Sequence, residues 1–430
     1  MKIVVAGTGY VGLVSGVCLA DKGYNVTCVD INEEKIENLS KGKSPIYEEG
    51  LENLLKKNIK KGNLHFTVNY KEAYKNADVI FIAVGTPEGK DGQANLSYVE
   101  NVSKQIAETV EKNCLIIIKS TVPVGTNDKI ENFIKKFIVN NVKIEVASNP
   151  EFLSQGHAIR DTFKAKRIII GTKSKKVEEI LKKIYKPFNL PIVSVSRRSA
   201  EMIKYACNDF LALKISYIND IANLCELTGA NIEEVVEGMS YDERIGTGFL
   251  QAGVGYGGSC LPKDTKALKY LGEQNGYLLK TVESAIEVNE VQKVKLLRKA
   301  YERLNSFEGL KIAILGVAFK AETDDVRAAP ALMNIDLLLR YGANIYVYDP
   351  VAINNLKKIY IDKIHYAVNI EEALKNADAC FIFTAWKQIK EIQPKKYKEL
   401  MKTPIIYDGR NIYSTEEMIK NGLEYYSIGR

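Results

Sequence analysis

The sequence predicts an α/β protein in which two doubly wound, parallel-sheet domains are joined by a central helical domain with one long helix. Both ends of the chain consist of short, continuous apolar runs separated by charged segments of helix length. Between them lies a stretch, Arg198 to Glu226, that contains neither Pro nor Gly. Residues 71–82 and 371–382 also share the pattern Glu-Ala-x-Lys-Asn-Ala-Asp-x-x-Phe-Ile. Strands that alternate with helices in this way indicate parallel sheets covered on both faces.

The N-terminal segment reads as a βαβ unit. A β-branched run, Ile3 to Ala6, is followed by a glycine turn and by an apolar helical stretch to about Ala20. A second short strand, Val26 to Val29, is closed by Asp30. Further apolar runs follow at 79–84, 115–118, 144–147, 167–170 and 192–195. Their continuous rather than alternating apolar character is typical of strands in a parallel sheet.

The middle of the chain is predicted to be helical. From Arg198 to Glu226 the apolar side chains recur at helical spacing, at Ile203, Cys207, Phe210, Leu213, Tyr217, Ile221 and Leu224. Helical segments follow at 231–238 and 262–306, with a glycine-dense loop at 246–258. From Lys311 the strand and helix pattern resumes, with strands at 312–315 and 345–348, a helix near 330–341, and Asp349 after the second strand. These changes place domain boundaries near residues 197 and 307.

Length and composition exclude several classes of protein. A chain of 430 residues is too long for one ordinary core, and its 46% hydrophobic content excludes wholesale disorder. The net charge of +7 is small and the lysines lie among glutamates, so we expect no nucleic-acid partner. The seven cysteines include no Cys-x-x-Cys pair, which argues against a disulfide scaffold or a zinc site and favours the reducing cytoplasm. The apolar stretch at 3–20 contains the glycine turn, so no membrane anchor is expected.

The first glycine turn has the spacing of a dinucleotide-binding loop. Gly7, Gly9 and Gly12 lie between a predicted strand and a predicted helix. In this motif the glycines make the turn, let the backbone approach a pyrophosphate and let the helix pack closely. Asp30 can accept hydrogen bonds from a ribose 2′-hydroxyl and would repel a 2′-phosphate, which favours NAD over NADP. A tight turn without a ligand is the alternative. The second copy, at 316–320, has one glycine and is not expected to bind a dinucleotide.

Cys260 is a candidate nucleophile in the segment 255–264, which reads Gly-Tyr-Gly-Gly-Ser-Cys-Leu-Pro-Lys-Asp. Pro262 suits the first turn of a helix, so the thiol would lie at a helix N-terminus, where the dipole and Lys263 favour the thiolate. The glycines would expose backbone N–H groups to an anionic ligand, and Asp264 lies one helical turn beyond the thiol. A buried, unreactive cysteine is the alternative.

Polar residues at other predicted element ends are further candidates. Lys204 and Asn208 are four residues apart on the long helix, where a cation and an amide on one face can hold an oxyanion. An ordinary polar stripe is the alternative. Thr121 and the segment 149–151 (Asn-Pro-Glu) follow predicted strands, and ligands collect at the carboxyl ends of parallel strands. His157 is the only histidine near such a loop, and a single histidine is more often a surface or packing residue than a catalytic one.

These motifs together resemble the UDP-glucose 6-dehydrogenase branch of the nucleotide-sugar dehydrogenase family over essentially the full length. The matching segments are 4–16 (VVAGTGYVGLVSG), 120–126 (STVPVGT), 148–153 (SNPEFL), 201–222 (EMIKYACNDFLALKISYINDIA), 255–264 (GYGGSCLPKD), 316–331 (GVAFKAETDDVRAAPA), 347–350 (VYDP) and 408–410 (Asp-Gly-Arg). The cysteine segment and the long helix are specific in combination.

The resemblance implies a four-electron oxidation at C6 of UDP-glucose to UDP-glucuronate. A hydride passes to NAD, the cysteine adds to the aldehyde, a second hydride passes to a second NAD, and water hydrolyses the thioester. The implied catalytic residues are Cys260 as nucleophile, Lys204 and Asn208 at the oxyanions, and Asp264, Thr121 and Glu151 for water and proton transfer.

The resemblance also implies binding residues and no metal. The cofactor contacts are Gly7, Gly9, Tyr10, Val11, Gly12, Asp30, Lys35, Thr86, Thr121, Glu151, Lys263 and Arg327. The substrate contacts are Glu151, Phe152, Leu153, Lys204, Asn208, Arg244, Phe249, Leu250, Gln251, Tyr256, Gly257, Cys260, Phe319, Lys320 and Arg410. Arg244 is expected to reach across a dimer built on the central helix.

By the same resemblance, 1–197 is the NAD-binding Rossmann domain, 198–306 the central dimerisation domain with the cysteine loop, and 307–430 the UDP-sugar-binding Rossmann-like domain. A homodimer or higher homo-oligomer in the cytoplasm is expected, with a role in nucleotide-sugar and polysaccharide metabolism. Gln155 stands where many relatives carry Glu, so no proton-transfer role is assigned to it. The alternatives are a GDP-mannose 6-dehydrogenase, another nucleotide-sugar dehydrogenase, and a non-catalytic protein that binds NAD and a nucleotide.

Overall fold

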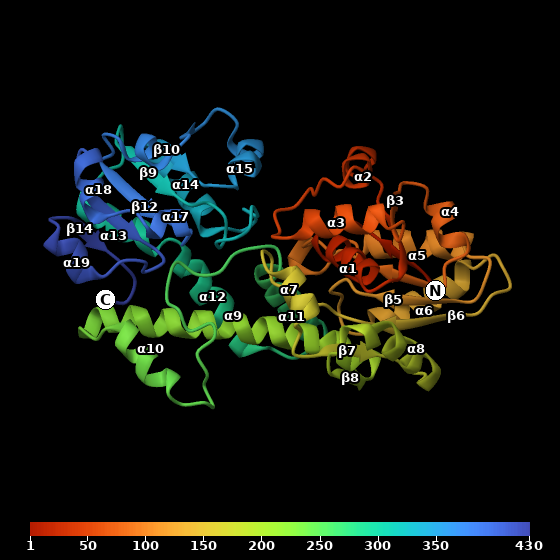
Figure 1. Cartoon of the computed structure of the whole chain (residues 1–430). Coiled ribbons are helices and arrows are strands. Elements are labelled where there is room, and N and C mark those ends of the chain that lie inside the picture. Colours follow the sequence, from red (N-terminus) through yellow and green to blue (C-terminus); the bar gives the residue numbers. More distant parts are fainter. The chain divides into compact units, whose positions relative to one another are not determined.

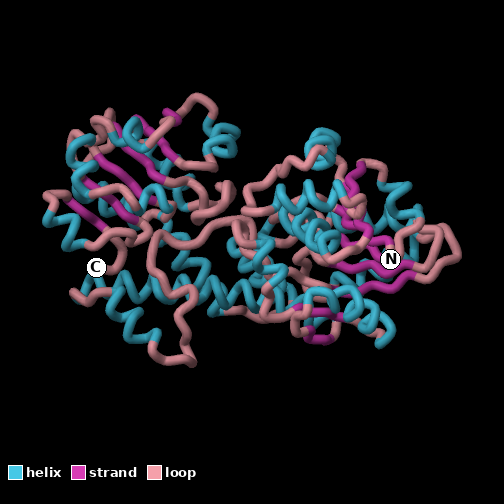
Figure 2. Tube along the Cα trace, in the orientation of Figure 1, coloured by secondary structure: helices cyan, strands magenta, loops and turns pink.

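The computed structural model describes residues 1–430, and its internal contacts divide the chain into two compact units, Met1–Cys207 and Asn208–Arg430. The division falls inside the long helix α9 (Arg197–Thr228), so each unit is described by itself. Figure 1 labels the elements, and Figure 2 shows that the strands of each unit are flanked by helices. The three-domain division with boundaries near 197 and 307 stays a prediction.

Strands and helices alternate along the first unit, as predicted. Its elements are β1 (Lys2–Ala6), α1 (Tyr10–Asp21), β2 (Asn25–Val29), α2 (Glu33–Ser40), α3 (Leu51–Lys60), β3 (Leu64–Thr67), α4 (Tyr70–Lys75), β4 (Val79–Ile82), η1 (Lys90–Gly92), α5 (Ser97–Thr109), β5 (Cys114–Ile118), α6 (Thr126–Phe137), β6 (Ile144–Ser148), α7 (Ala158–Phe163), β7 (Ile168–Gly171), α8 (Lys175–Tyr185), η2 (Lys186–Phe188) and β8 (Ile192–Val195).

These strands form one eight-stranded sheet in the order β3-β2-β1-β4-β5-β6-β7-β8. β1 pairs in parallel with both β2 and β4, so the strand order reverses beside it, which is the position where doubly wound sheets bind ligands. One pair differs from the parallel sheet that we predicted, because β7 runs antiparallel to β6. A continuous apolar run reports burial on both faces of a strand and carries no information about its direction.

Side chains of successive strand residues enter two separate cores. Ile3 and Val5 of β1 pack with residues of α1, α3, α7 and α8 on one face of the sheet. Val4 and Ala6 pack with residues of α4, α5 and α6 on the other face. This two-sided burial explains the continuous apolar runs of the central strands β1, β4 and β5, whose apolar residues are buried on both faces, whereas Val193 in the edge strand β8 is 41% exposed.

The second unit contains the rest of α9, a set of helices and a second sheet. Its further elements are α10 (Ile232–Ser240), α11 (Leu261–Gln274), α12 (Lys280–Lys293), α13 (Lys295–Leu304), β9 (Lys311–Leu315), α14 (Pro330–Arg340), β10 (Asn344–Tyr348), α15 (Ile353–Tyr360), β11 (His365–Tyr366), α16 (Ile370–Leu374), β12 (Ala379–Ile382), α17 (Lys387–Lys390), α18 (Pro394–Leu400), β13 (Ile405–Asp408), α19 (Thr415–Lys420) and β14 (Glu424–Tyr426).

The second sheet has six strands in the order β11-β10-β9-β12-β13-β14, and every pair is parallel. Its central strand β9 lies between β10 and β12, as β1 lies between β2 and β4. The predicted fold class is therefore confirmed: two doubly wound sheets are separated in the chain by helices that include one long helix, α9. None of the helices combines the length and apolar character that crossing a membrane requires.

Candidate active site

The glycine turn after β1 leaves its backbone open to a ligand. Gly7 has φ 96°, in the left-handed region, and a Cβ on Gly12 would lie 2.0 Å from the Gly7 carbonyl oxygen. Gly9 differs, because a Cβ there would meet no atom within 4 Å. The space beside Gly9 at the start of α1 is thus available to a pyrophosphate, and the loop fits NAD.

Asp30 closes this loop from the end of β2. Its Oδ2 accepts hydrogen bonds from the Thr8 backbone N–H at 2.9 Å and the Thr8 hydroxyl at 2.6 Å, and it pairs with Lys35 Nζ at 3.0 Å. Burial alone would raise the pKa of Asp30, but the hydrogen bonds from Thr8 and Lys35 hold it below its ordinary value. The carboxylate is therefore ionised, as recognition of a ribose hydroxyl requires.

Tyr10 makes its polar contacts within the protein. Its hydroxyl donates to Glu48 and accepts a hydrogen bond from the Gly156 N–H at 2.6 Å. This side chain therefore ties the start of α1 to the loop after β6. The predicted cofactor contact at Tyr10 stays a prediction.

The loops after β4 and β5 are joined through their threonines. The Thr86 hydroxyl donates to the carbonyl oxygen of Thr121 at 2.8 Å. Both residues were predicted to contact the cofactor, and both follow strands on the same side of the topological switch point. The structure thus brings these two predicted residues together.

Glu151 and Lys204 form a buried ion pair. Lys204 Nζ lies 3.0 Å from Glu151 Oε1, and the two side chains are 4% and 5% exposed. Burial alone would raise the pKa of Glu151, but the Lys204 ammonium and the Leu153 N–H hold it below its ordinary value. Lys204 Nζ also lies 5.3 Å from the centre of the Phe152 ring. The lysine is therefore held in one position by a fixed counter-charge.

Lys119 is a buried lysine that the sequence analysis missed. Its Nζ donates to Asn149 Oδ1 at 3.1 Å, and burial lowers its pKa to about 8, against the opposing effect of Glu151. The Tyr185 hydroxyl donates to the same Asn149 oxygen. The sequence does contain a feature that predicts it. Lys119 directly follows a continuous apolar strand, and the carboxyl ends of parallel strands are where ligands bind.

A cavity of about 360 Å³ opens beside these residues within the first unit. Lys119, Glu151, Phe152 and Leu153 line it, together with Arg167, whose guanidinium lies 4.2 Å from the centre of the Phe152 ring. Three predicted substrate residues therefore border one cavity, and a buried cation lies in its wall.

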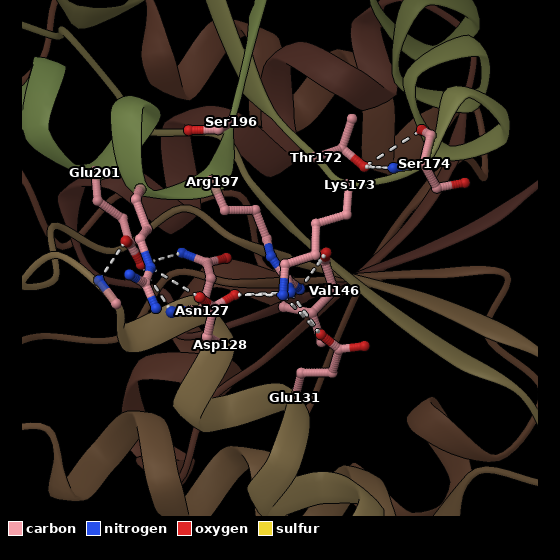
Figure 3. Close-up of polar contacts among 12 residues, drawn as sticks. Asn127, Asp128, Glu131, Val146, Thr172, Lys173, Ser174, Ser196, Arg197 and Glu201 are labelled. Atoms are coloured by element: carbon pink, nitrogen blue, oxygen red, sulfur yellow. Dashed lines mark hydrogen bonds and ion pairs between the residues drawn. The ribbon is translucent and has the colours of Figure 1, made fainter.

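Three catalytic candidates lie on elements that a buried polar cluster holds together (Figure 3). Arg197, 3% exposed at the start of α9, pairs with Glu131 Oε2 at 2.5 Å and Asp128 Oδ1 at 2.8 Å, both on α6. It also donates to the Val146 carbonyl of β6 at 3.0 Å. Thr121 precedes α6, Glu151 follows β6 and Lys204 belongs to α9. The cluster therefore joins the three elements on which, or next to which, these candidates lie.

Glu201 adds a second connection between α9 and the threonine loop. Its carboxylate accepts the backbone N–H groups of Gly125 at 2.6 Å and Asn127 at 2.7 Å, at the N-terminus of α6. The Asn127 side chain donates to it as well, at 2.6 Å. A carboxylate at a helix N-terminus is electrostatically favourable, and here it lies one helical turn before Lys204.

In the second unit, Cys260 occupies the N-cap position of α11. The thiol is exposed, and the helix of 14 residues begins at Leu261 with Pro262 in its first turn. The Cys260 carbonyl accepts the Asp264 N–H at 2.9 Å, which is the first hydrogen bond of the helix. A thiol at this position is favoured as the thiolate by the helix dipole.

Two other side chains fix the position of the Asp264 carboxylate. It is 1% exposed, and it accepts hydrogen bonds from Asn208 Nδ2 at 2.6 Å and Lys263 Nζ at 2.5 Å. Lys263 was expected to favour the cysteine thiolate, whereas its ammonium is paired here with Asp264. Asn208, Lys263 and Asp264 therefore form one connected polar group, and two of its members, Lys263 and Asp264, lie three and four residues after Cys260 in the chain.

The glycine loop before Cys260 is packed more tightly than expected. A Cβ on Gly257 would lie 2.4 Å from the Ala328 carbonyl oxygen, and one on Gly258 would lie 2.9 Å from the Phe319 ring. The Gly258 N–H donates to the Arg327 carbonyl at 2.8 Å, and the Tyr256 N–H donates to Asn289 Oδ1 at 2.8 Å. The expectation that this loop leaves its amides open to an anion is therefore wrong for these two. The glycines serve close packing.

Arg327 and Arg410, two predicted ligand contacts, are both hydrogen-bonded to other residues of the second unit. Arg327 pairs with Asp325 at 2.6 Å, and this hydrogen bond is the main cause that raises the pKa of its guanidinium group. Arg410 donates to the carbonyl oxygens of Phe383 at 2.7 Å and Phe319 at 3.0 Å. These contacts place both guanidinium groups at the loops that pack around the cysteine segment.

The remaining predicted substrate residues divide by exposure. Leu250 and Tyr256 are buried, whereas Phe249 is 49% exposed and has φ 64°, unusual for a residue other than glycine. Arg244 is exposed and pairs with Asp242 at 2.6 Å. Gln251 is exposed, while Lys320 is half-buried. No group of three His, Cys, Asp or Glu side chains is placed to hold a metal ion.

Comparison with known proteins covers the whole chain. Models of the UDP-glucose/GDP-mannose dehydrogenase family match as its NAD binding domain at residues 1–189, its central domain at 198–291 and its UDP binding domain at 313–415. The UDP-glucose 6-dehydrogenase YwqF of Bacillus subtilis (strain 168) is 49% identical over 430 residues, covering 100% of this chain and 98% of that protein.

Solved structures agree with this assignment. A UDP-glucose dehydrogenase from Pyrobaculum islandicum has a TM-score of 0.92 at 35% identity, covering 99% of this chain and 96% of that one. A UDP-D-ManNAc dehydrogenase from Pyrococcus horikoshii has a TM-score of 0.88 at 30% identity, covering 100% and 99%. The NAD binding domain confirms the predicted cofactor, and the UDP binding domain confirms a small-molecule substrate. The chain belongs to the UDP-glucose/GDP-mannose dehydrogenase family.

Proposed function

We propose that this chain oxidises UDP-glucose to UDP-glucuronate in two successive two-electron steps, with Cys260 as the covalent nucleophile. The observation that carries the proposal is the position of Cys260, exposed at the N-terminus of α11 with the buried Asp264 one helical turn beyond. The full-length similarity to a UDP-glucose 6-dehydrogenase supports the choice of sugar.

The thiol divides a difficult oxidation into two feasible ones. NAD supplies the hydride acceptor in both oxidations. In the first, C6 loses a hydride and its hydroxyl loses a proton, which leaves an aldehyde. The Cys260 thiolate then forms a C–S bond to that carbon, and the resulting thiohemiacetal loses the second hydride to become a thioester. Water adds to the thioester, the C–S bond breaks, and the carboxylate leaves with the thiolate restored.

The polar residues of each unit supply the matching functions in this proposal. Lys204, with its charge fixed by Glu151, is proposed as a donor to the oxyanion that forms at C6. Asn208 is proposed as a second donor, and Asp264 as the base that activates water. Thr121 and Glu151 take part in proton transfer. The hydrogen bond between Asn208 and Asp264 supports a shared task for these two residues.

A dimer built on α9 is part of the proposal. Phe210, Tyr217 and Leu224 are 60%, 51% and 54% exposed and recur every seven residues, so they form one apolar stripe on the part of the helix that belongs to the second unit. Such a stripe stays in water unless another helix covers it. A second copy of the chain is the proposed occupant, with Arg244 reaching across, and analytical ultracentrifugation of the protein tests it.

We also propose that the protein works in the reducing cytoplasm. Five of the seven cysteines are buried, and the proposed chemistry requires the exposed Cys260 as a thiolate. An oxidising compartment would inactivate that nucleophile. Activity that requires a reductant in the assay and is lost on mild oxidation is the expected behaviour.

The test counts NADH per molecule of limiting nucleotide sugar in excess NAD. We expect two NADH from each UDP-glucose, with GDP-mannose and UDP-N-acetylmannosamine run in parallel as competing substrates. Two NADH from one of these sugars and none from UDP-glucose would keep the chemistry and overturn the substrate. If none of the three sugars yields NADH while the protein still binds NAD and a nucleotide, a non-catalytic role would be favoured.

A further inference from the structure

Asp209 is a buried carboxyl group without a hydrogen-bond partner on any other residue. The residue is 6% exposed, neither oxygen of its carboxyl group is bonded to another side chain or to the backbone of another residue, and the donor that acts on it is its own backbone N–H. It directly follows Asn208 in α9. It is not among the residues proposed to catalyse the reaction or to bind a ligand. A buried carboxylate that keeps its charge without a donor is strongly unfavourable, so this group requires an explanation.

Asp264 is the charged side chain that acts on Asp209. The negative charge of Asp264 raises the pKa of Asp209 after burial, which is the larger cause, and together they bring it to about 8. A second negative charge buried near Asp264 is unfavourable, so Asp209 keeps its proton to a higher pH than an ordinary aspartate does.

The contacts of the two carboxyl groups decide which of them holds that proton. Asp264 accepts hydrogen bonds from Asn208 at 2.6 Å and from the Lys263 ammonium at 2.5 Å, and these donors stabilise a negative charge. Asp209 has no such donor. The surroundings of Asp264 therefore suit a carboxylate, whereas those of Asp209 suit the neutral acid.

The loop packed against this pair adds no competing ionisation near neutral pH. Burial raises the pKa of Tyr256 to about 12, the Asp209 charge adds to that rise, and a hydrogen bond with Thr265 opposes it. Glu290 on α12 acts on Tyr256 in the same direction as Asp209. The titratable side chains coupled to Asp209 are thus those of Asp264 and Tyr256.

We propose that Asp209 is a positioning residue that controls charge at the site: it holds a proton while the enzyme works and releases it in alkaline solution, which switches the site off. The inference rests on the proposed function for its effect on turnover. Once ionised, Asp209 places a second buried negative charge beside Asp264, and that charge opposes the thiolate at Cys260 and the oxyanions at C6. Asp209 acts through Asp264 and does not itself touch the reacting atoms.

The first test is stability, which does not depend on turnover. Between about pH 4 and about pH 8 the folded protein holds one more proton than the unfolded chain, so Asp209 makes stability fall as pH rises through that window. The melting temperature of Asp209→Asn minus that of wild type should therefore rise across the window and level off above it. Asp220→Asn, an exposed position on the same helix, should give a constant difference.

A constant difference for Asp209→Asn would overturn the proposal. Infrared difference spectra of wild type against the variant at neutral pH provide a second readout, in which a protonated-carboxyl band is expected and a carboxylate band contradicts it. If Asp209→Asn fails to fold, Asp209→Leu takes its place in both measurements, because leucine, like asparagine, has no titratable side chain.

The second test is the pH profile of turnover. The ratio of kcat for Asp209→Asn to kcat for wild type should rise by about tenfold from pH 7 to pH 9, because only the wild type gains the extra charge. Titrations common to both proteins cancel in this ratio. A flat ratio would overturn the effect on catalysis. If no nucleotide sugar is turned over at all, the proposed function has failed, and the stability test still decides the protonation of Asp209.

Discussion

The first loops of the two sheets are built on the same plan. Gly7 follows the central strand of one sheet with φ 96°, and Gly316 follows that of the other with φ 83°. In both, an amide of the loop donates to an aspartate at the end of the next strand: the Thr8 N–H to Asp30 at 2.9 Å, and the Val317 N–H to Asp349 at 2.8 Å.

The two loops differ in what surrounds that aspartate. The Asp30 side chain is 12% exposed beside Lys35, and the neighbouring Gly9 leaves open space. Asp349 is 3% exposed, and it also accepts hydrogen bonds from Ala318, Val351 and Ala352 N–H and from Trp386 Nε1. One loop can therefore receive a dinucleotide, whereas in the other the aspartate is already hydrogen-bonded by five donors of the protein. The same topology serves two ligand classes, and the residues at the loop decide between them.

The largest expected effect is that of replacing Cys260, which should lower turnover and leave NAD affinity unchanged. Cys260→Ser should lower turnover by more than about 10³-fold, because a hydroxyl is a far weaker nucleophile than a thiolate. NAD affinity, measured by fluorescence titration, should stay within about twofold, because the glycine turn lies in the other unit. Cys207→Ser, the same change at a half-buried thiol, is the control and should keep most activity. Wild-type turnover in the Cys260 variant would remove the covalent step.

Asp349 should matter for stability and not for the cofactor. Replacing it by Ala leaves five donors without their acceptor, so we expect a loss of about 3 kcal/mol in the free energy of unfolding. Urea unfolding measures this loss. NAD affinity should be unchanged where the variant is folded, and a weakened NAD affinity would mean that the second loop also serves the cofactor.

Asp30 should show the opposite pattern. Asp30→Asn removes the charge that would accept the ribose hydroxyl hydrogen bonds, and NAD affinity should fall by about tenfold. The melting temperature should change less than in the Asp349 variant, because Asp30 is less buried. NADP binding should improve relative to NAD binding, because the charge that repels a 2′-phosphate is removed. Equal stability losses in both aspartate variants would contradict the difference between the loops.

Gly9 should give the smallest effect on stability. Its φ of −68° suits any residue, and a Cβ there meets no atom, so Gly9→Ala should change the free energy of unfolding by less than about 0.5 kcal/mol. NAD affinity should still fall severalfold, because the methyl group occupies the space meant for the pyrophosphate. A large loss of stability would mean that this space is filled by protein.

Most of the two sheets could be predicted because their strands are continuous apolar runs. The long helix could be predicted for the same kind of reason, since Arg198 to Glu226 keeps one period without a break. β3, β11 and β14 were missed because they are short and contain no such run, and β13 (Ile405–Asp408) was not assigned although most of its residues are apolar. The antiparallel direction of β7 was also missed, because apolar character reports burial and not direction.

The candidate site was predictable where its residues share one element. Cys260 and Asp264 are one turn apart in α11, so spacing alone brings them together. The hydrogen bond between Asn208 and Asp264 joins residues 56 positions apart, and the Glu201 contact with Asn127 joins residues 74 apart. Contacts of this range follow from how the elements pack. For the same reason the missing partners of Asp209 could not be read from the sequence.

The covalent intermediate on Cys260 is the most direct test of the account. Asp264→Asn should slow hydrolysis, so that the variant, mixed with UDP-glucose and NAD and quenched in acid, retains the oxidised sugar as a thioester. Mass spectrometry of the digested protein should then find the adduct on the peptide that contains Cys260. Formation of two NADH per UDP-glucose by the wild type, with an adduct on another residue or on none in either protein, would contradict the account.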